Sequence, residues 1–138
     1  HVIGLLDDGF KEANKNIKGS EILILGVSYK PDVKDIQLSP AKHIVEKLLT
    51  NGATVKIYDP YYKSTTIFDI KTEDDLSKAV TDSDAIVIVT AHDEFKCLEP
   101  DFFVSKMKIP IVIDARGVID IRAAKKAGIV FYGLGRGN

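Results

Sequence analysis

The sequence predicts an α/β fold with a parallel sheet of about five strands and helices on both faces. Short, uninterrupted apolar runs at 22–25, 85–89 and 111–113 are typical of strands that are buried on both faces. Amphipathic helical patterns alternate with these runs along the chain. Because right-handed crossovers bring the carboxyl ends of parallel strands to one rim, this alternation predicts a Rossmann-like three-layer sandwich.

A helical pattern opens the chain, and its apolar residues share one face: Val2, Leu5, Leu6, Phe10 and Ala13. The pattern starts without a Met or an N-cap residue, so we expect residues 1–17 to be the end of a connecting helix that continues an upstream segment. Lys18-Gly19-Ser20 then predicts a turn. Residues 18–138 have the length of one domain.

The clearest helix follows the first strand. Ser39-Pro40 is a helix start, because the Ser hydroxyl accepts a hydrogen bond from an orphan N–H and Pro at the first helical position loses none. Apolar residues then repeat at helical spacing until Asn51-Gly52 supplies a left-handed stop. His43 lies on the opposite, charged face, so we interpret it as a solvated histidine.

The remaining elements follow in order. Thr54–Tyr58 alternates as a strand that ends at the Asp59-Pro60 turn, whereas residues 61–71 give no clear pattern. Thr72-Glu73-Asp74-Asp75 resembles a capping box and predicts a helix through Val80. After the strand at 85–89 we expect a helix at 101–108, a strand at 111–113, a helix at 121–126 stopped by Gly128, a strand at 129–132 and a flexible tail.

The composition of the chain excludes several classes of partner. The net charge is −1 without a lysine run, so nucleic acid is not an expected partner. No apolar stretch approaches the roughly 20 residues of a membrane span and no signal peptide opens the chain, so we expect no membrane contact and a cytoplasmic protein. The single Cys97 excludes an internal disulfide and is interpreted as a small core filler, and the three scattered histidines predict no metal site.

The crossover after the first strand contains a cluster of residues that could bind a ligand. Tyr29, Lys30, Asp32, Lys34 and Asp35 fall within seven residues, stiffened by a proline. An aromatic ring can stack on a base, a lysine can face a phosphate, and carboxylates can accept hydrogen bonds from sugar hydroxyls. The simpler interpretation is a solvated connection whose charges keep it soluble.

We expect a set of polar residues on the rim formed by the strand ends: Tyr29, Lys30, Asp59, His92 and Arg116. Lys30 and Arg116 would supply the two cations that an anionic ligand requires. Asp59 is interpreted as a turn residue, and His92 with Asp93 as a polar loop cluster.

A dinucleotide site does not fit the sequence. Its fingerprint needs three glycines in a tight turn between strand and helix, so that the backbone approaches the pyrophosphate. Here Gly26 is followed by a long, bulky crossover before Ser39.

Several ordered motifs resemble one family. Residues 18–35, Ser39-Pro40-Ala41, Tyr58-Asp59-Pro60 and Asp114-Ala115-Arg116 resemble the C-terminal UDP-binding domain of the UDP-glucose/GDP-mannose dehydrogenase family. The resemblance covers residues 18–136. The run from His92 to Lys96 is most similar to the UDP-N-acetyl-D-mannosamine dehydrogenase branch.

The resemblance implies a three-part enzyme. An N-terminal domain binds NAD, a central helical region supports a homodimer or higher oligomer, and the present domain holds the UDP-sugar. Residues 1–17 would then be the end of the helix from the central domain. Such enzymes oxidise the C6 alcohol of the sugar to a carboxylate through a cysteine that lies upstream, so no catalytic residue is expected in this chain, which alone would be inactive.

By position, the resemblance places Tyr29 near uracil, Lys30 at the family's substrate-loop lysine and Asp32 and Asp35 in the same loop. Arg116 matches the arginine of its Asp-x-Arg motif. The family usually has an arginine that reaches the NAD pyrophosphate where this chain has Gln37, which can donate a hydrogen bond but carries no charge. The alternatives are a stand-alone α/β nucleotide-binding or interaction module and, least favoured, a small NAD-dependent protein.

Overall fold

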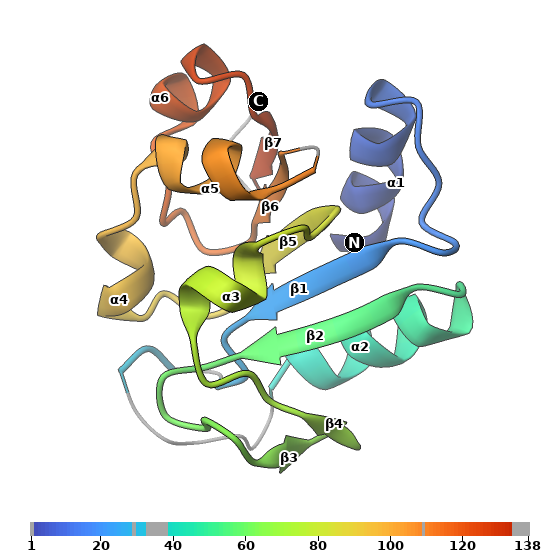
Figure 1. Cartoon of the computed structure of the whole chain (residues 1–138), viewed down its shortest axis with the longest axis vertical. Coiled ribbons are helices and arrows are strands. Elements are labelled where there is room, and N and C mark those ends of the chain that lie inside the picture. Colours follow the sequence, from blue (N-terminus) through green and yellow to red (C-terminus); the bar gives the residue numbers. More distant parts are fainter. Residues whose placement is uncertain (1, 29, 33–38, 109, 134–138) are drawn as a thin grey trace.

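The computed structural model describes residues 2–28, 30–32, 39–108 and 110–133 of the chain. Figure 1 shows its elements, which in order are α1 (Val2–Glu12), β1 (Glu21–Leu25), α2 (Ala41–Thr50), β2 (Thr54–Tyr58), β3 (Thr66–Ile67), β4 (Ile70–Lys71), α3 (Leu76–Val80), β5 (Ala85–Ile88), α4 (Asp93–Lys96), α5 (Pro100–Lys106), β6 (Ile111–Asp114), α6 (Ile121–Lys126) and β7 (Val130–Gly133). Each strand and helix expected from the sequence is present, with small shifts at its ends.

The main sheet has five strands in the order β2-β1-β5-β6-β7, and every neighbouring pair is parallel. This confirms the predicted architecture. From β1 the chain moves first to β2 on one side and later to β5 on the other, so the strand order reverses between β1 and β5. In open α/β sheets, ligands bind in the crevice outside the carboxyl ends of two such strands.

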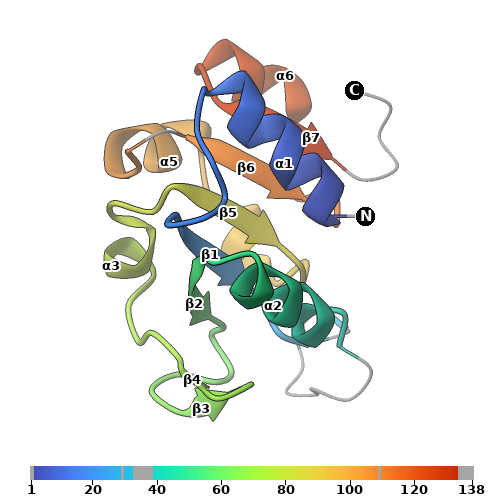
Figure 2. The ribbon, with the colours of Figure 1, turned by 90° about the vertical axis from the view of Figure 1, so that its right-hand side faces the viewer.

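Helices cover both faces of the sheet, as Figure 2 shows. The core under α1 and α2 includes Ile22 and Ile24 of β1, whereas the core under α3, α5 and α6 includes Leu23 and Leu25. Successive side chains of a strand point to opposite faces, so a strand between two cores must be apolar at every position. The unbroken apolar runs therefore have a direct structural cause.

Helix α1 contributes to the first of these cores. Its Val2, Leu6 and Phe10 side chains are buried there beside β6 residues. The hydroxyl of Tyr132 in β7 donates a hydrogen bond of 2.6 Å to Glu12 at the end of the helix. Residues 2–12, which the sequence predicts to be the end of a connecting helix, thus pack as part of this domain.

Residues 61–71, which gave no clear sequence pattern, contain the small hairpin β3–β4 at 66–71. Its two-residue turn, Phe68-Asp69, has positive φ angles of 52° and 65°. A turn of this kind usually carries Asn-Gly or Asp-Gly, so a bulky residue at its first position hid the hairpin. Buried Ile67 ties the hairpin to the core of the α1 side.

Two helix starts refine the sequence analysis. The Ser39 hydroxyl accepts a hydrogen bond of 3.1 Å from the Ala41 N–H, and Pro40 has helical angles, as predicted. The cap of α3 is Asp75, which accepts a hydrogen bond from the Lys78 N–H. The expected cap, Thr72, is instead buried and donates to the Tyr62 carbonyl.

The one-turn helix α4 was not expected. It packs through buried Phe95, and Cys97 caps its C-terminal end in an exposed position. The interpretation of Cys97 as a core filler is therefore wrong, because the phenylalanine two residues earlier fills the core at this point.

Candidate functional site

The chain segments that follow β1 and β5 lie side by side at the point where the strand order reverses. The Thr90 hydroxyl donates a hydrogen bond of 2.7 Å to the Ser28 carbonyl, and the Val89 N–H donates one of 2.9 Å to the Leu25 carbonyl. Gly26 has a φ of +93°, and a Cβ on it would lie 2.9 Å from the Thr90 nitrogen and closer still to the Thr90 side chain. Only glycine permits this approach.

Asp59 organises the same rim from the end of β2. It is fully buried, and its Oδ2 accepts a hydrogen bond of 2.8 Å from the Val27 N–H, while its Oδ1 accepts one of 2.8 Å from the Tyr61 N–H. The second bond is the turn role expected from the sequence. The first bond ties the end of β2 to the segment that leaves β1.

His92 connects Asp59 to the crossover. Its Nε2 lies 3.0 Å from Asp59 Oδ2, and its Nδ1 accepts a hydrogen bond of 2.8 Å from the backbone N–H of Asp32. Because a backbone N–H can only donate, Nδ1 must be unprotonated and the ring proton must lie on Nε2, where it donates to Asp59. The imidazole is 1% exposed and packs edge-on against Phe95.

The exposed turn at Lys30–Asp32 is therefore anchored through two groups of Asp32, its backbone N–H and its side-chain carboxylate. Its N–H binds His92, and its Oδ1 accepts a hydrogen bond of 2.8 Å from the Asp93 N–H. Asp32 has a φ of +58°, a left-handed conformation that these two bonds hold in place. Lys30, two residues earlier, is exposed at the rim.

Helix α4, which carries the Asp93 anchor, is itself fixed to the sheet. The Tyr58 hydroxyl of β2 donates a hydrogen bond of 2.7 Å to Glu94 Oε1. Burial first, and then this hydrogen bond, raise the pKa of Tyr58 well above its usual range. The phenol therefore remains a donor at any physiological pH.

Arg116 reaches the rim from the end of β6. The carboxylate of buried Asp114 accepts backbone hydrogen bonds from Arg116 and Gly117 at Oδ1 and from Ile119 at Oδ2, which shapes the loop after the strand. The Arg116 Nε donates a hydrogen bond of 2.9 Å to the Val89 carbonyl just beyond β5. The guanidinium is thereby held beside the switch point.

We predict that Asp114→Asn lowers the free energy of unfolding by about 1–3 kcal/mol, because the amide NH₂ must face at least one backbone N–H donor. Urea denaturation measures the change. Asp120→Asn is the matched control: Asp120 accepts N–H bonds from Arg122 and Ala123 at the exposed start of α6, where Asn caps as well as Asp. Equal effects of the two substitutions would contradict the role given to Asp114.

Three of the expected site residues lie in the described part of the chain and follow strands of the sheet at their carboxyl ends. Lys30 and Asp32 come after β1 and Arg116 comes after β6, the two strands that flank β5. Tyr29, Asp35 and Gln37 lie outside the described residues. The interpretation of His92 and Asp93 as a loop cluster missed the main partner, Asp59, because 33 positions separate the two residues and no periodicity links them.

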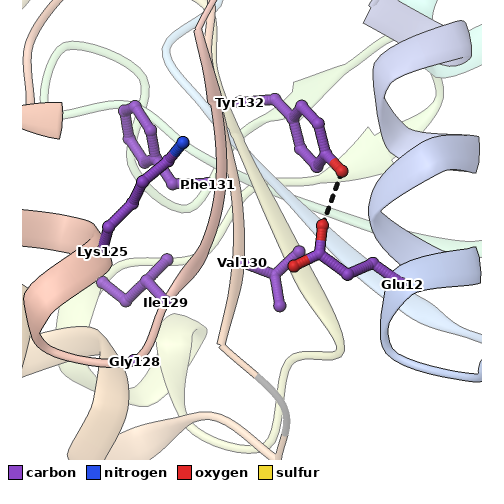
Figure 3. Close-up of a pocket in the computed structure, with 7 residues that line it drawn as sticks. All are labelled: Glu12, Lys125, Gly128, Ile129, Val130, Phe131 and Tyr132. Carbon is purple, nitrogen blue, oxygen red and sulfur yellow. Dashed lines mark hydrogen bonds between the residues drawn. The ribbon is translucent and has the colours of Figure 1, made fainter. Parts of the chain in front are cut away.

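A different hollow, of about 410 Å³, lies along the outer edge of β7. Figure 3 shows the residues that line it. Tyr132 points toward Glu12, and their hydrogen bond, followed by burial, raises the pKa of Tyr132 to about 12. Lys125 is the cation in its lining, and the Glu12 carboxylate opposes an anionic ligand. The rim, by contrast, carries two cationic side chains, Lys30 and Arg116.

Within the described residues, no three His, Cys, Asp or Glu side chains gather closely enough to hold a metal ion. None of the helices in this part of the chain has the length and apolar character required to cross a membrane.

The fold and the rim define a doubly wound α/β domain of the nucleotide-binding type, with a charged crossover in place of a glycine turn. The chain belongs to the UDP-glucose/GDP-mannose dehydrogenase family: the model of the family's UDP binding domain matches residues 23–121. This confirms the resemblance seen in the sequence.

Among its relatives is the UDP-N-acetyl-D-mannosamine dehydrogenase of Pyrococcus horikoshii, 38% identical over 137 residues, a match that covers 98% of this chain and 30% of that protein. The UDP-glucose 6-dehydrogenase of Rickettsia bellii is 32% identical over 127 residues, covering 88% of this chain and 29% of that protein. The similarity thus extends to more than one kind of UDP-sugar dehydrogenase.

Solved structures agree with these relatives. The structure of the UDP-D-ManNAc dehydrogenase from Pyrococcus horikoshii matches with a TM-score of 0.86 and 35% identity, over 99% of this chain and 30% of that chain. That of the NDP-N-acetyl-D-galactosaminuronic acid dehydrogenase from Methanosarcina mazei Go1 has a TM-score of 0.88 and 27% identity, over 99% and 29%. The present chain spans about 30% of the length of the relatives it matches.

Proposed function

We propose that this chain is the C-terminal UDP-sugar-binding domain of an NAD-dependent nucleotide-sugar 6-dehydrogenase, one that converts UDP-N-acetyl-D-mannosamine to UDP-N-acetyl-D-mannosaminuronate. The observation that carries the proposal is the position of Lys30 and Arg116 at the ends of β1 and β6, on either side of the switch point, in a chain that matches a UDP binding domain. Two cations at such a switch point suit a diphosphate.

Each rim residue then has a role. Lys30 and Arg116 bind the diphosphate, and Asp32 accepts a hydrogen bond from a ribose or sugar hydroxyl beside the one it already accepts from Asp93. We further propose that Tyr29 packs against uracil and that Asp35 lines the same loop. No residue of this chain is proposed to be catalytic.

This domain does not itself fit NAD. A dinucleotide turn needs open space beside its glycines for the pyrophosphate, and here the Thr90 side chain fills the space beside Gly26. We propose that NAD, which accepts the hydride in this class of enzyme, binds mainly to an N-terminal domain of a longer chain that forms a homodimer or higher oligomer. From the present domain, Gln37 would contribute at most an uncharged hydrogen bond to the cofactor.

The proposal is tested by calorimetric titration of the chain with UDP at about pH 8, where the terminal phosphate, with a pKa of about 6, is ionised. Lys30→Ala should weaken binding about 10- to 100-fold, because it removes a charge-assisted hydrogen bond. Lys126→Ala is the control, since Lys126 is exposed at the end of α6, which leads to the opposite rim at the start of β7. A folded chain that does not bind UDP, or equal binding by Lys30→Ala, would refute the proposal.

A further inference from the structure

We infer that His92 is a positioning residue whose uncharged, Nε2-protonated form holds the Lys30 turn for nucleotide binding, and that its protonation weakens that binding. The inference rests on the proposed function and adds a pH-dependent control to the same site. It comes from a hydrogen-bond chain that runs in one direction, from the Asp32 N–H through the imidazole to the Asp59 carboxylate.

The direction of this series of hydrogen bonds is set at both of its ends. Asp32 offers a backbone N–H, which can only donate, and Asp59 Oδ2 already accepts from the Val27 N–H, as a carboxylate oxygen does. The imidazole can satisfy both ends only when Nδ1 is bare and Nε2 carries the proton. A second proton, on Nδ1, would point at the Asp32 N–H, and two donors would then face each other.

The charged groups around His92 act on a protonated ring in the opposite direction to the Asp32 N–H. The carboxylates of Asp59 and Asp32 face the ring from β2 and from the crossover, with Asp32 Oδ1 3.8 Å from Nδ1, and Asp93 and Glu94 follow His92 in its own segment. The other groups packed on the ring are the aromatic side chains of Tyr61 and Phe95. The carboxylates would attract a positive charge on the ring, whereas the Asp32 N–H points a donor at Nδ1.

Protonation therefore has a definite structural consequence. The new Nδ1–H must find Asp32 Oδ1, which now accepts from Asp93, so the backbone of Asp32 must rotate or withdraw from the ring. Lys30 is two residues away and moves with it.

The test is calorimetric binding of UDP-glucose from about pH 5.5 to about pH 8, a window that spans the titration of histidine. UDP-glucose is the probe because its diphosphate is esterified at both ends and does not titrate in this window, unlike the terminal phosphate of UDP. We expect the affinity of the unmodified chain to fall at least about fivefold toward the acid end, as expected for the loss of about one hydrogen bond.

Two isosteric variants separate the two bonds of the imidazole. His92→Asn places an amide oxygen where Nδ1 was, so it still accepts from Asp32 and should bind as tightly as the unmodified chain does at the alkaline end. His92→Gln places an amide NH₂ near the Nε2 position, which still donates to Asp59 but leaves the Asp32 N–H without an acceptor. It should bind about 5- to 10-fold more weakly. Neither variant titrates, so both should lose the pH dependence.

His43→Gln is the control, because His43 is exposed on α2 and takes no part in the hydrogen bonds that join Asp32, His92 and Asp59, and it should leave the pH profile unchanged. A full pH dependence in His92→Asn, or unimpaired binding by His92→Gln at the alkaline end, would overturn the inference. If the unmodified chain binds no UDP-glucose at any pH, the proposed function fails. Nitrogen NMR then decides on His92: an Asp32 amide signal that moves as His92 titrates supports the coupling, and one that does not move refutes it.

Discussion

Gly26→Ala should lower the free energy of unfolding by about 3–5 kcal/mol, as the sum of a conformational and a steric cost. The conformational cost arises because Gly26 has a φ of +93°, which residues with a Cβ rarely adopt. The steric cost arises because the new methyl would overlap the Thr90 side chain and lie 2.9 Å from the Thr90 nitrogen, which is backbone and cannot move aside cheaply. Urea denaturation of both proteins measures the difference.

Gly128→Ala isolates the conformational part of this cost. Gly128, after α6, has a nearly equal φ of +91°, but no atom lies within 4 Å of the Cβ that the substitution would add. We expect it to lower the free energy of unfolding by only about 1–2 kcal/mol. If the two variants were equally destabilised, contact with Thr90 would not be the reason for glycine at position 26. Gly26→Ala should also weaken UDP binding, since β1 and β5 meet at this point.

The sequence predicted the architecture because two-sided burial leaves a strong mark on it. Strands such as β1 and β5 lie between two helical layers and must be apolar at each fully buried position, and the helices between them must be amphipathic. The same logic placed Lys30 and Arg116 on one rim, since parallel strands end on the same side. The sequence did not predict the β3–β4 hairpin. Its turn residues, Phe68-Asp69, do not resemble a hairpin turn, although both have positive φ angles.

The hydrogen bonds within the rim could not be predicted in this way. Asp59, His92 and Asp32 come from three separate connections, and their pairing depends on how far each chain segment extends beyond its strand. Periodicity reports which face a side chain takes, but not which polar group it meets. The topology indicated that these residues share a rim, and only the folded structure shows that Asp59 accepts hydrogen bonds from both Val27 and His92.

Asp59→Ala should therefore be among the most damaging substitutions, with a loss of about 3–5 kcal/mol in the free energy of unfolding. It leaves the Val27 and Tyr61 N–H groups and the His92 Nε2–H without their acceptor, in a position that is 0% exposed. The segments that follow β1, β2 and β5 would lose their common anchor. Urea denaturation measures the loss, and UDP titration should show weaker binding because Val27, in the segment that leads to the Lys30 turn, loses its hydrogen bond to Asp59.

Asp84→Ala is the matched control for Asp59→Ala. Asp84 Oδ2 also accepts a backbone hydrogen bond of 2.8 Å, from the Glu21 N–H at the start of β1, but it is only partly buried and lies at the opposite rim. Its removal should cost about 1 kcal/mol, because solvent can replace the lost acceptor, and should leave UDP binding unchanged. Equal losses for the two variants would mean that water enters the Asp59 site freely, and a buried anchor could then not explain the position of the Lys30 turn.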